Sequence, residues 1–108
     1  MNIKEYKKEA KLIRDTDVYK VYDKKFGDMV LSLTELNPDK KTAGHSHDDV
    51  NEVYVCVEGV GYIIIGDEER RMTKGEVFMI PAGEFHQVAN TSANPLVFWS
   101  IFNKYGDR

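Results

Sequence analysis

The feature that most constrains the fold is a succession of short apolar runs that fills the chain after residue 17. The runs are rich in valine, isoleucine, tyrosine and phenylalanine, and glycine, proline, asparagine or aspartate bounds each of them. This pattern is typical of β-strands separated by turns. It predicts eight strands, at about residues 18–23, 28–36, 51–58, 60–66, 69–73, 76–80, 85–90 and 96–103. No helical period separates the runs, so we expect an all-β chain that forms a sandwich or a small barrel.

The length of 108 residues allows one domain with one hydrophobic core. We expect an N-terminal leader at residues 1–17, followed by a barrel domain at residues 18–108. Residues 3–14 mix lysine and glutamate with scattered apolar side chains, which indicates a short helix or an irregular segment. Residues 1–25 contain eight basic and five acidic groups. We interpret this basic leader as a solvated segment, with a recognition arm as the alternative.

Composition excludes several classes of protein. The formal net charge of −3 argues against a protein that binds duplex nucleic acid, because such proteins present a basic face. Cys56 is the single cysteine, so no intramolecular disulfide can form. No apolar run approaches the roughly 18 residues of a membrane span, and the charged start lacks the pattern of a signal peptide. We therefore expect a cytoplasmic protein with neither a nucleic-acid nor a membrane partner.

Two of the predicted strands are apolar on both faces. Residues 53–57 and 96–99 show no alternation between apolar and polar side chains. One face of a strand in a small barrel lies in the core, so an apolar second face requires a cover. We expect a homodimer in which sheet faces of two subunits cover each other. The alternative is that the N-terminal segment of the same chain covers this face.

The three histidines of the chain form one pattern with a glutamate. His45 and His47 flank a single serine, so in an extended segment they share one face, with Cα atoms about 6.6 Å apart. Glu52 follows five positions after His47, which requires a turn or bulge within residues 48–51 for all three side chains to converge. His86 comes 34 residues after Glu52, directly behind the turn signal Pro-Ala-Gly.

Three imidazoles and one carboxylate are a suitable ligand set for a divalent transition metal such as Fe, Mn, Ni or Zn. A six-coordinate ion bound by four protein side chains keeps two positions for water, substrate or dioxygen. We therefore expect one such ion as the cofactor and a small molecule as the ligand or substrate.

These residues resemble the two motifs of the cupin superfamily. The first motif is present as His45-x-His47-x4-Glu52-x6-Gly59, and the second as Gly75-x5-Pro81-Ala82-Gly83-x2-His86-x3-Asn90. One position departs from the first motif, because Asp39 stands where the family has a glycine six positions before the first histidine. The resemblance covers about residues 20–103 and includes the short spacing between motifs that is typical of small single-domain cupins.

The resemblance implies a double-stranded β-helix, which is a small jelly-roll barrel, with one metal ion bound inside it by His45, His47, Glu52 and His86. In the family the glutamate also takes up a proton by leaving the metal, which makes Glu52 a candidate catalytic residue. Tyr54 shares a strand face with Glu52, so it is a second candidate, either positioning a substrate oxygen or donating a proton. A core tyrosine with its hydroxyl at the rim is the alternative.

Cupins catalyse unrelated reactions, so the fold does not settle the function. A site of three histidines and one glutamate suits dioxygenase-type chemistry or the isomerisation and epimerisation of open-chain sugars. The segments 52–61 and 90–98 look like the corresponding stretches of archaeal cupin-type glucose-6-phosphate isomerases. We therefore expect a metal-dependent enzyme of one of these two kinds. The alternative is a non-catalytic, metal-loaded module that binds a sugar or another small molecule.

Overall fold

The structure, a computed structural model, describes residues 2–103. These residues contain one helix, α1 (Ile3–Glu9), and nine strands. The strands are β1 (Lys11–Asp15), β2 (Tyr19–Phe26), β3 (Met29–Leu36), β4 (Glu52–Glu58), β5 (Val60–Ile65), β6 (Glu68–Thr73), β7 (Val77–Ile80), β8 (His86–Ala89) and β9 (Leu96–Asn103). The eight predicted strands are therefore confirmed, with ends that differ by a few residues.

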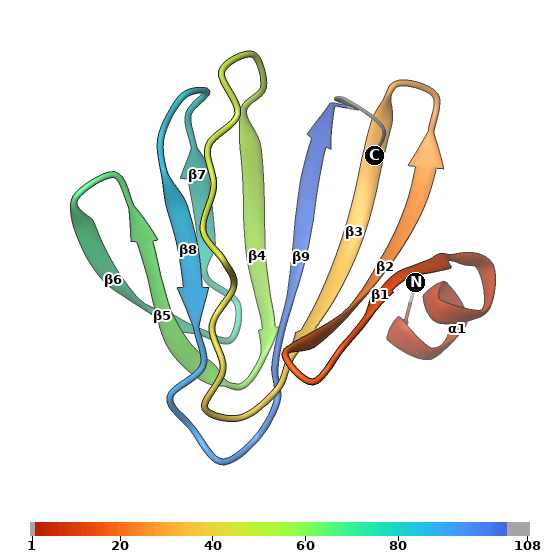
Figure 1. Ribbon diagram of the computed structural model, residues 1–108. Helices are drawn as coiled ribbons and strands as arrows, with labels where there is room; N and C mark the ends of the chain where they lie inside the picture. The colour runs from red at the N-terminus through yellow and green to blue at the C-terminus, as the bar shows by residue number, and fades with distance from the viewer. Residues whose placement is uncertain (1, 104–108) are drawn as a thin grey trace.

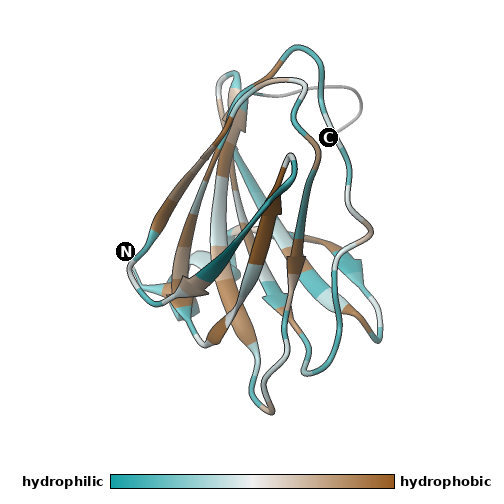
Figure 2. Cartoon of the chain, turned by 90° about the vertical axis from the view of Figure 1, so that its left-hand side faces the viewer, coloured by the Kyte–Doolittle hydropathy of each residue, from teal (hydrophilic) through white to brown (hydrophobic). Residues whose placement is uncertain are grey.

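The strands form two antiparallel sheets that face each other (Figure 1). The larger sheet has the order β1-β2-β3-β9-β4-β7, and the smaller has the order β6-β5-β8. Side chains that point inward from both sheets form the core, among them Leu36, Ile63 and Phe98. Figure 2 shows that most of the strongly hydrophobic residues lie in strands, whereas the loops are largely hydrophilic. The predicted all-β class is confirmed.

Helix α1 packs on the outer face of the larger sheet. The Tyr6 side chain is fully buried against Leu33 and Val97, and its ring meets the Trp99 ring edge-on, with centroids 4.8 Å apart. The Tyr6 hydroxyl directs its one hydrogen at the carbonyl oxygens of two strand residues, Tyr22 and Leu31, which share it. The N-terminal segment therefore covers part of the face that we expected to need a cover.

Part of this outer face, at the β7 edge, is apolar and exposed. Val77 and Met79 on the edge strand β7 are 64% and 60% exposed. The register places them directly opposite Val55 and Val53 of β4. The cover supplied by α1 thus ends before the β7 edge of the sheet.

The leader contains a strand that the sequence analysis did not predict. The helix begins after Asn2, whose side chain accepts a hydrogen bond from the Glu5 amide, and it ends where Ala10 takes an extended conformation. Residues Lys11–Asp15 then pair with β2 as the edge strand of the larger sheet. This strand is short and mostly charged, so it lacks the apolar signal by which the other strands were found.

Asp39, the one departure from the motifs, takes the conformation that a glycine would favour. Its φ of 59° lies in the left-handed region, and Asp39 is the one non-glycine residue with positive φ among residues 2–103. Aspartate tolerates this region better than most residues because its short polar side chain can form local hydrogen bonds. The turn is therefore formed without the glycine. Within residues 2–103, no helix is long and apolar enough to cross a membrane.

Candidate metal centre

The four side chains singled out in the sequence converge between the two sheets. His45, His47, Glu52 and His86 each offer one ligand atom, and these atoms all lie within 4.8 Å of one another. Glu52 is the first residue of β4 in the larger sheet, and His86 is the first residue of β8 in the smaller one. His45 and His47 lie on the long connection between β3 and β4. The predicted convergence is thus present in the structure.

Backbone pairing positions His45 against His86. The His45 amide donates to the His86 carbonyl at 3.1 Å, and the His86 amide donates to the His45 carbonyl at 2.9 Å. This reciprocal pair is the arrangement of an antiparallel bridge, in which side chains of opposite residues leave on the same side. The two imidazole rings accordingly lie 4.3 Å apart between centroids.

The turn that Glu52 requires is confirmed at Asp48 and Asp49, which are exposed. Two hydrogen bonds connect this segment to the turn before His86. The Gly83 amide donates to the His47 carbonyl at 2.7 Å, and the Ala82 amide donates to Asn51 Oδ1 at 2.8 Å. Asn51 is a positioning residue that the sequence reasoning missed, since its only signal was its place in a turn.

Gly83 allows the chain to aim His86 into the site. Its φ of 85° is accessible to glycine but strained for other residues, as expected from the Pro-Ala-Gly turn signal. The Glu84 carbonyl then accepts a hydrogen bond from His86 Nδ1–H at 3.1 Å. This bond leaves Nε2 directed at the cluster, which is the arrangement that orients metal-binding histidines. The Glu84 side chain itself is exposed.

Glu52 is the buried anion of the cluster, with 2% of its surface exposed. Its Oε1 lies 3.7 Å from His47 Nε2, and its Oε2 lies 3.4 Å from His86 Nε2. Burial raises the pKa of the Glu52 carboxyl, but the imidazoles of His86, His47 and His45 lower it by more, so this pKa lies below its ordinary value. The carboxylate is therefore ionised at neutral pH.

The arrangement fits a divalent transition metal. The His86 Nε2 atom is buried and makes no hydrogen bond of good geometry to any residue in 2–103. A buried polar atom of this kind is costly unless a partner, such as an ion, occupies the site. Nitrogen and carboxylate donors from four side chains match the ligands preferred by Fe, Mn, Ni or Zn. The cluster could thus hold one metal ion.

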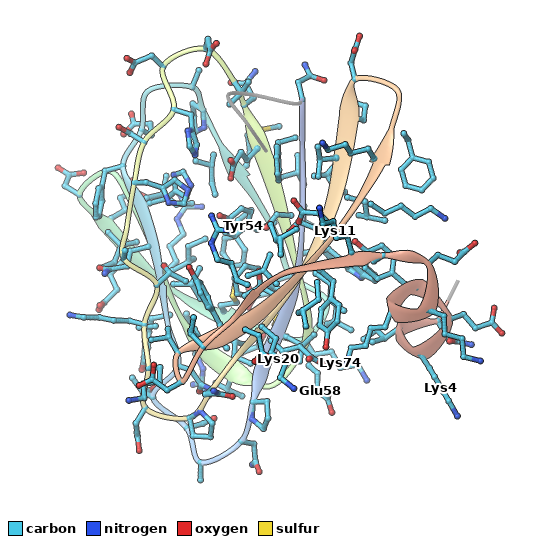
Figure 3. The ribbon with its side chains drawn as sticks, turned by 45° about the vertical axis from the view of Figure 1, so that its right-hand side comes forward. Lys4, Lys11, Lys20, Tyr54, Glu58 and Lys74 are labelled. Carbon is cyan, nitrogen blue, oxygen red and sulfur yellow. The ribbon has the colours of Figure 1, made fainter. Side chains whose placement is uncertain are left out.

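Tyr54 lies next to the cluster, two residues along β4 from Glu52. Its buried ring meets the His86 ring edge-on at 5.8 Å and stacks on Phe98 at 5.2 Å between centroids. Figure 3 shows Tyr54 near the middle of the molecule. Cys56, further along the same face, is buried in the core, and burial raises the pKa of its thiol. Cys56 thus behaves as a small buried hydrophobic residue.

The cluster opens into a cavity of about 910 Å³. His45, His47, Glu52 and Tyr54 line one part of it. The hydroxyl-bearing side chains of Thr34 and Ser100 and the aromatic rings of Phe98 and Phe102 also line the cavity. A further wall comes from β1 and β2, with Lys11, Ile13, Arg14, Val21, Asp23 and Lys25. Strands β1 and β2 thus form part of the cavity wall, although neither carries a residue of the two sequence motifs.

Comparison with known proteins agrees with this architecture. A protein of Thermus thermophilus has a TM-score of 0.79 and 27% identity, over 95% of this chain and 97% of that one. A sugar phosphate isomerase of the cupin superfamily from Silicibacter pomeroyi has a TM-score of 0.75 and 22% identity, over 85% of this chain and 68% of that one.

A curated relative, a glucose-6-phosphate isomerase of Pyrococcus abyssi, is 32% identical over 105 residues. The match covers 82% of this chain but 56% of that protein, so the chain spans about half the length of the curated relatives it matches. Residues 32–102 match the cupin domain family. The double-stranded β-helix implied by the two sequence motifs is therefore confirmed, and the chain belongs to the cupin family.

Proposed function

We propose that the protein is a metal-dependent isomerase of small hydroxy-carbonyl compounds such as open-chain sugars. The observation that carries the proposal is the convergence of three imidazoles and one carboxylate within 4.8 Å, at the wall of a cavity large enough for such a molecule. The similarity to archaeal glucose-6-phosphate isomerases supports this reaction class and suggests sugar phosphates as the first compounds to test.

A bound divalent ion would supply a Lewis acid that polarises a carbonyl oxygen and favours the enediol form of the substrate. His45, His47, Glu52 and His86 would bind it. Glu52 is ionised and lies at the cavity wall, so its carboxylate can accept a proton from one substrate carbon and return it to the next. We propose Glu52 and Tyr54 as the catalytic residues.

Tyr54 would hold a substrate oxygen through its phenol, or donate a proton to it. The stacked Phe98 ring and the adjoining His86 ring restrict the orientation of the tyrosine. The hydroxyl groups of Thr34 and Ser100 line the same cavity and suit a ligand with several hydroxyl groups. These polar groups support a sugar-like ligand over a wholly apolar one.

The test is an assay of the protein reconstituted separately with Mn²⁺, Fe²⁺, Ni²⁺ and Zn²⁺. Interconversion of an aldose phosphate and the matching ketose phosphate would be followed by NMR, while an electrode records oxygen. The proposal expects interconversion without oxygen uptake. Oxygen uptake without interconversion would replace it with dioxygenase-type chemistry, and tight binding without any product would replace it with a binding module.

We also propose that the protein is a homodimer. Val53, Val55, Val77 and Met79 form an apolar patch at the β7 edge of the outer face, where the cover by α1 ends. A second copy of the same chain would cover this patch with its own, since two-fold symmetric interfaces pair identical surfaces. The exposure of Val77 and Met79 supports this arrangement.

A further inference from the structure

One wall of the cavity carries an excess of cationic side chains. Lys11 and Arg14 reach it from β1, and Lys24 and Lys25 reach it from β2. Figure 3 shows Lys11 near the middle of the molecule, whereas Lys4 lies at its margin. Part of the basic segment at residues 1–25 therefore forms a wall of the cavity that the candidate metal ligands also line.

A β-bulge aims Arg14 at this cavity. Lys11 pairs with Asp23 and Leu12 pairs with Tyr22, but the register then shifts so that Arg14, and not Ile13, pairs with Val21. Val21 and Asp23 are buried and line the cavity, whereas Tyr22 packs on the opposite face against α1. With a regular register, Arg14 would lie opposite Lys20, away from the cavity. Bulges near functional sites commonly redirect a side chain in this way.

Three of these cations differ from the fourth in their ion pairing. Lys24 forms an ion pair with Glu9 at 3.1 Å. Within residues 2–103, Lys11, Arg14 and Lys25 form no ion pair with a carboxylate. The Arg14 guanidinium donates one hydrogen bond, to the Ile13 carbonyl at 3.0 Å. Its remaining N–H groups can therefore donate to a ligand. Exposed cations that line a cavity attract anions, and the planar fork of the arginine guanidinium can bind two oxygens of a carboxylate or a phosphate group at once.

We propose that Lys11, Arg14 and Lys25 form a subsite for an oxyanion. The oxyanion would be a carboxylate or phosphate group of the small molecule that reaches the candidate metal centre. This inference deepens the proposed function. It rests on that function for one point, namely that the other end of the ligand binds at the candidate metal centre. The bulge would then serve to set the guanidinium on the cavity side of the sheet. The acidic ligand would bridge the cationic wall and the metal centre.

The test is calorimetric titration of the metal-free 108-residue chain with inorganic phosphate and, separately, with malonate. Wild type is expected to bind at least one of them saturably. Arg14→Gln and Lys11→Gln are each expected to weaken binding about tenfold, the loss of one charge-assisted hydrogen bond. Lys20→Gln is the matched control, since Lys20 lies on β2 but does not line the cavity. This variant should bind phosphate or malonate with the affinity of wild type.

Tighter binding of phosphate would indicate that the natural ligand is a phosphate ester, and tighter binding of malonate would indicate that it is a carboxylate. Both substituted residues are exposed, so the variants should keep the wild-type melting temperature, which is measured alongside. Equal affinity of wild type and both variants, or the absence of saturable binding in wild type, would overturn the subsite. Because this titration needs neither metal nor turnover, its result is separate from that of the isomerase assay.

Discussion

The Nε2 atom of His86 lies 3.4 Å from Oε2 of Glu52, and each side chain is 3% exposed. The two residues begin strands of different sheets, β8 in the smaller sheet and β4 in the larger one. The cluster therefore connects the two sheets at a buried part of the cavity wall. A metal ion bound there would stabilise the fold as well as the site, because ligands that bind only the native state shift the unfolding equilibrium.

Replacement of Tyr54 by phenylalanine distinguishes a catalytic role of the Tyr54 hydroxyl from a purely structural role of the side chain. Tyr54→Phe keeps the ring that stacks on Phe98 and removes only the hydroxyl. We expect turnover to fall at least about 100-fold, the lower end of what proton-transfer catalysis contributes, while metal affinity stays at the wild-type value. Turnover is measured by the NMR assay and metal affinity by calorimetry. Unchanged turnover would assign Tyr54 to the core alone.

The buried phenol of Tyr6 predicts a dependence of stability on alkaline pH. Burial and the nearby Asp23 raise the pKa of Tyr6 well above its ordinary value of 10.0. The unfolded chain ionises near that ordinary value, so this contribution to stability is complete below it and is lost as pH rises further. The urea concentration at the unfolding midpoint should therefore fall more between about pH 8 and about pH 11 for wild type than for Tyr6→Phe.

The same variant reports on the packing of α1. At about pH 8, Tyr6→Phe should lower the free energy of unfolding by about 1 kcal/mol, since it removes the hydroxyl that donates to Tyr22 and Leu31. Parallel pH slopes for the two proteins would contradict the account of the buried phenol.

Cys56 provides a probe of global unfolding. Its thiol is buried, burial raises its pKa, and it is the single cysteine of the chain. Because the thiolate is the reactive form, a disulfide reagent should label the native protein slowly and the urea-unfolded protein at once. Labelling is followed by absorbance. Rapid labelling of the native protein would show that this face of β4 is accessible in solution.

The homodimer predicts a mass of twice 12.4 kDa by light scattering during size-exclusion chromatography. Met79→Lys places a charge in the apolar patch on β7 and should shift the protein to the monomer mass. Arg70→Lys, an exposed position on β6, is the control and should leave the mass unchanged. A wild-type monomer at micromolar concentration would exclude the dimer.

Much of the fold followed from local signals. Turn residues and β-branched runs predicted all eight strands from residue 18 onward, because each strand contributes one face to the core. The turn at Asp48 and Asp49 followed from the requirement that Glu52 point inward. The predicted ligand set converged because motif spacing and strand parity together determine on which face each residue lies.

What escaped prediction depends on contacts between distant segments. The strand Lys11–Asp15 forms by pairing with β2 and has little apolar character of its own. The direction of Arg14 depends on a bulge, and a one-residue shift in register reverses the face of every following side chain. The role of Asn51 depends on an amide 31 residues away. No local pattern specifies any of these three.

The most direct test of the central claim is elemental analysis of protein purified without chelators or an affinity tag. The account predicts about one divalent transition metal per chain in wild type, as expected for a mononuclear site. Glu52→Gln should retain much less, whereas Glu58→Gln, at the exposed end of the same strand, should retain as much as wild type. Substoichiometric metal in wild type, or equal metal content in Glu52→Gln, would contradict the metal centre.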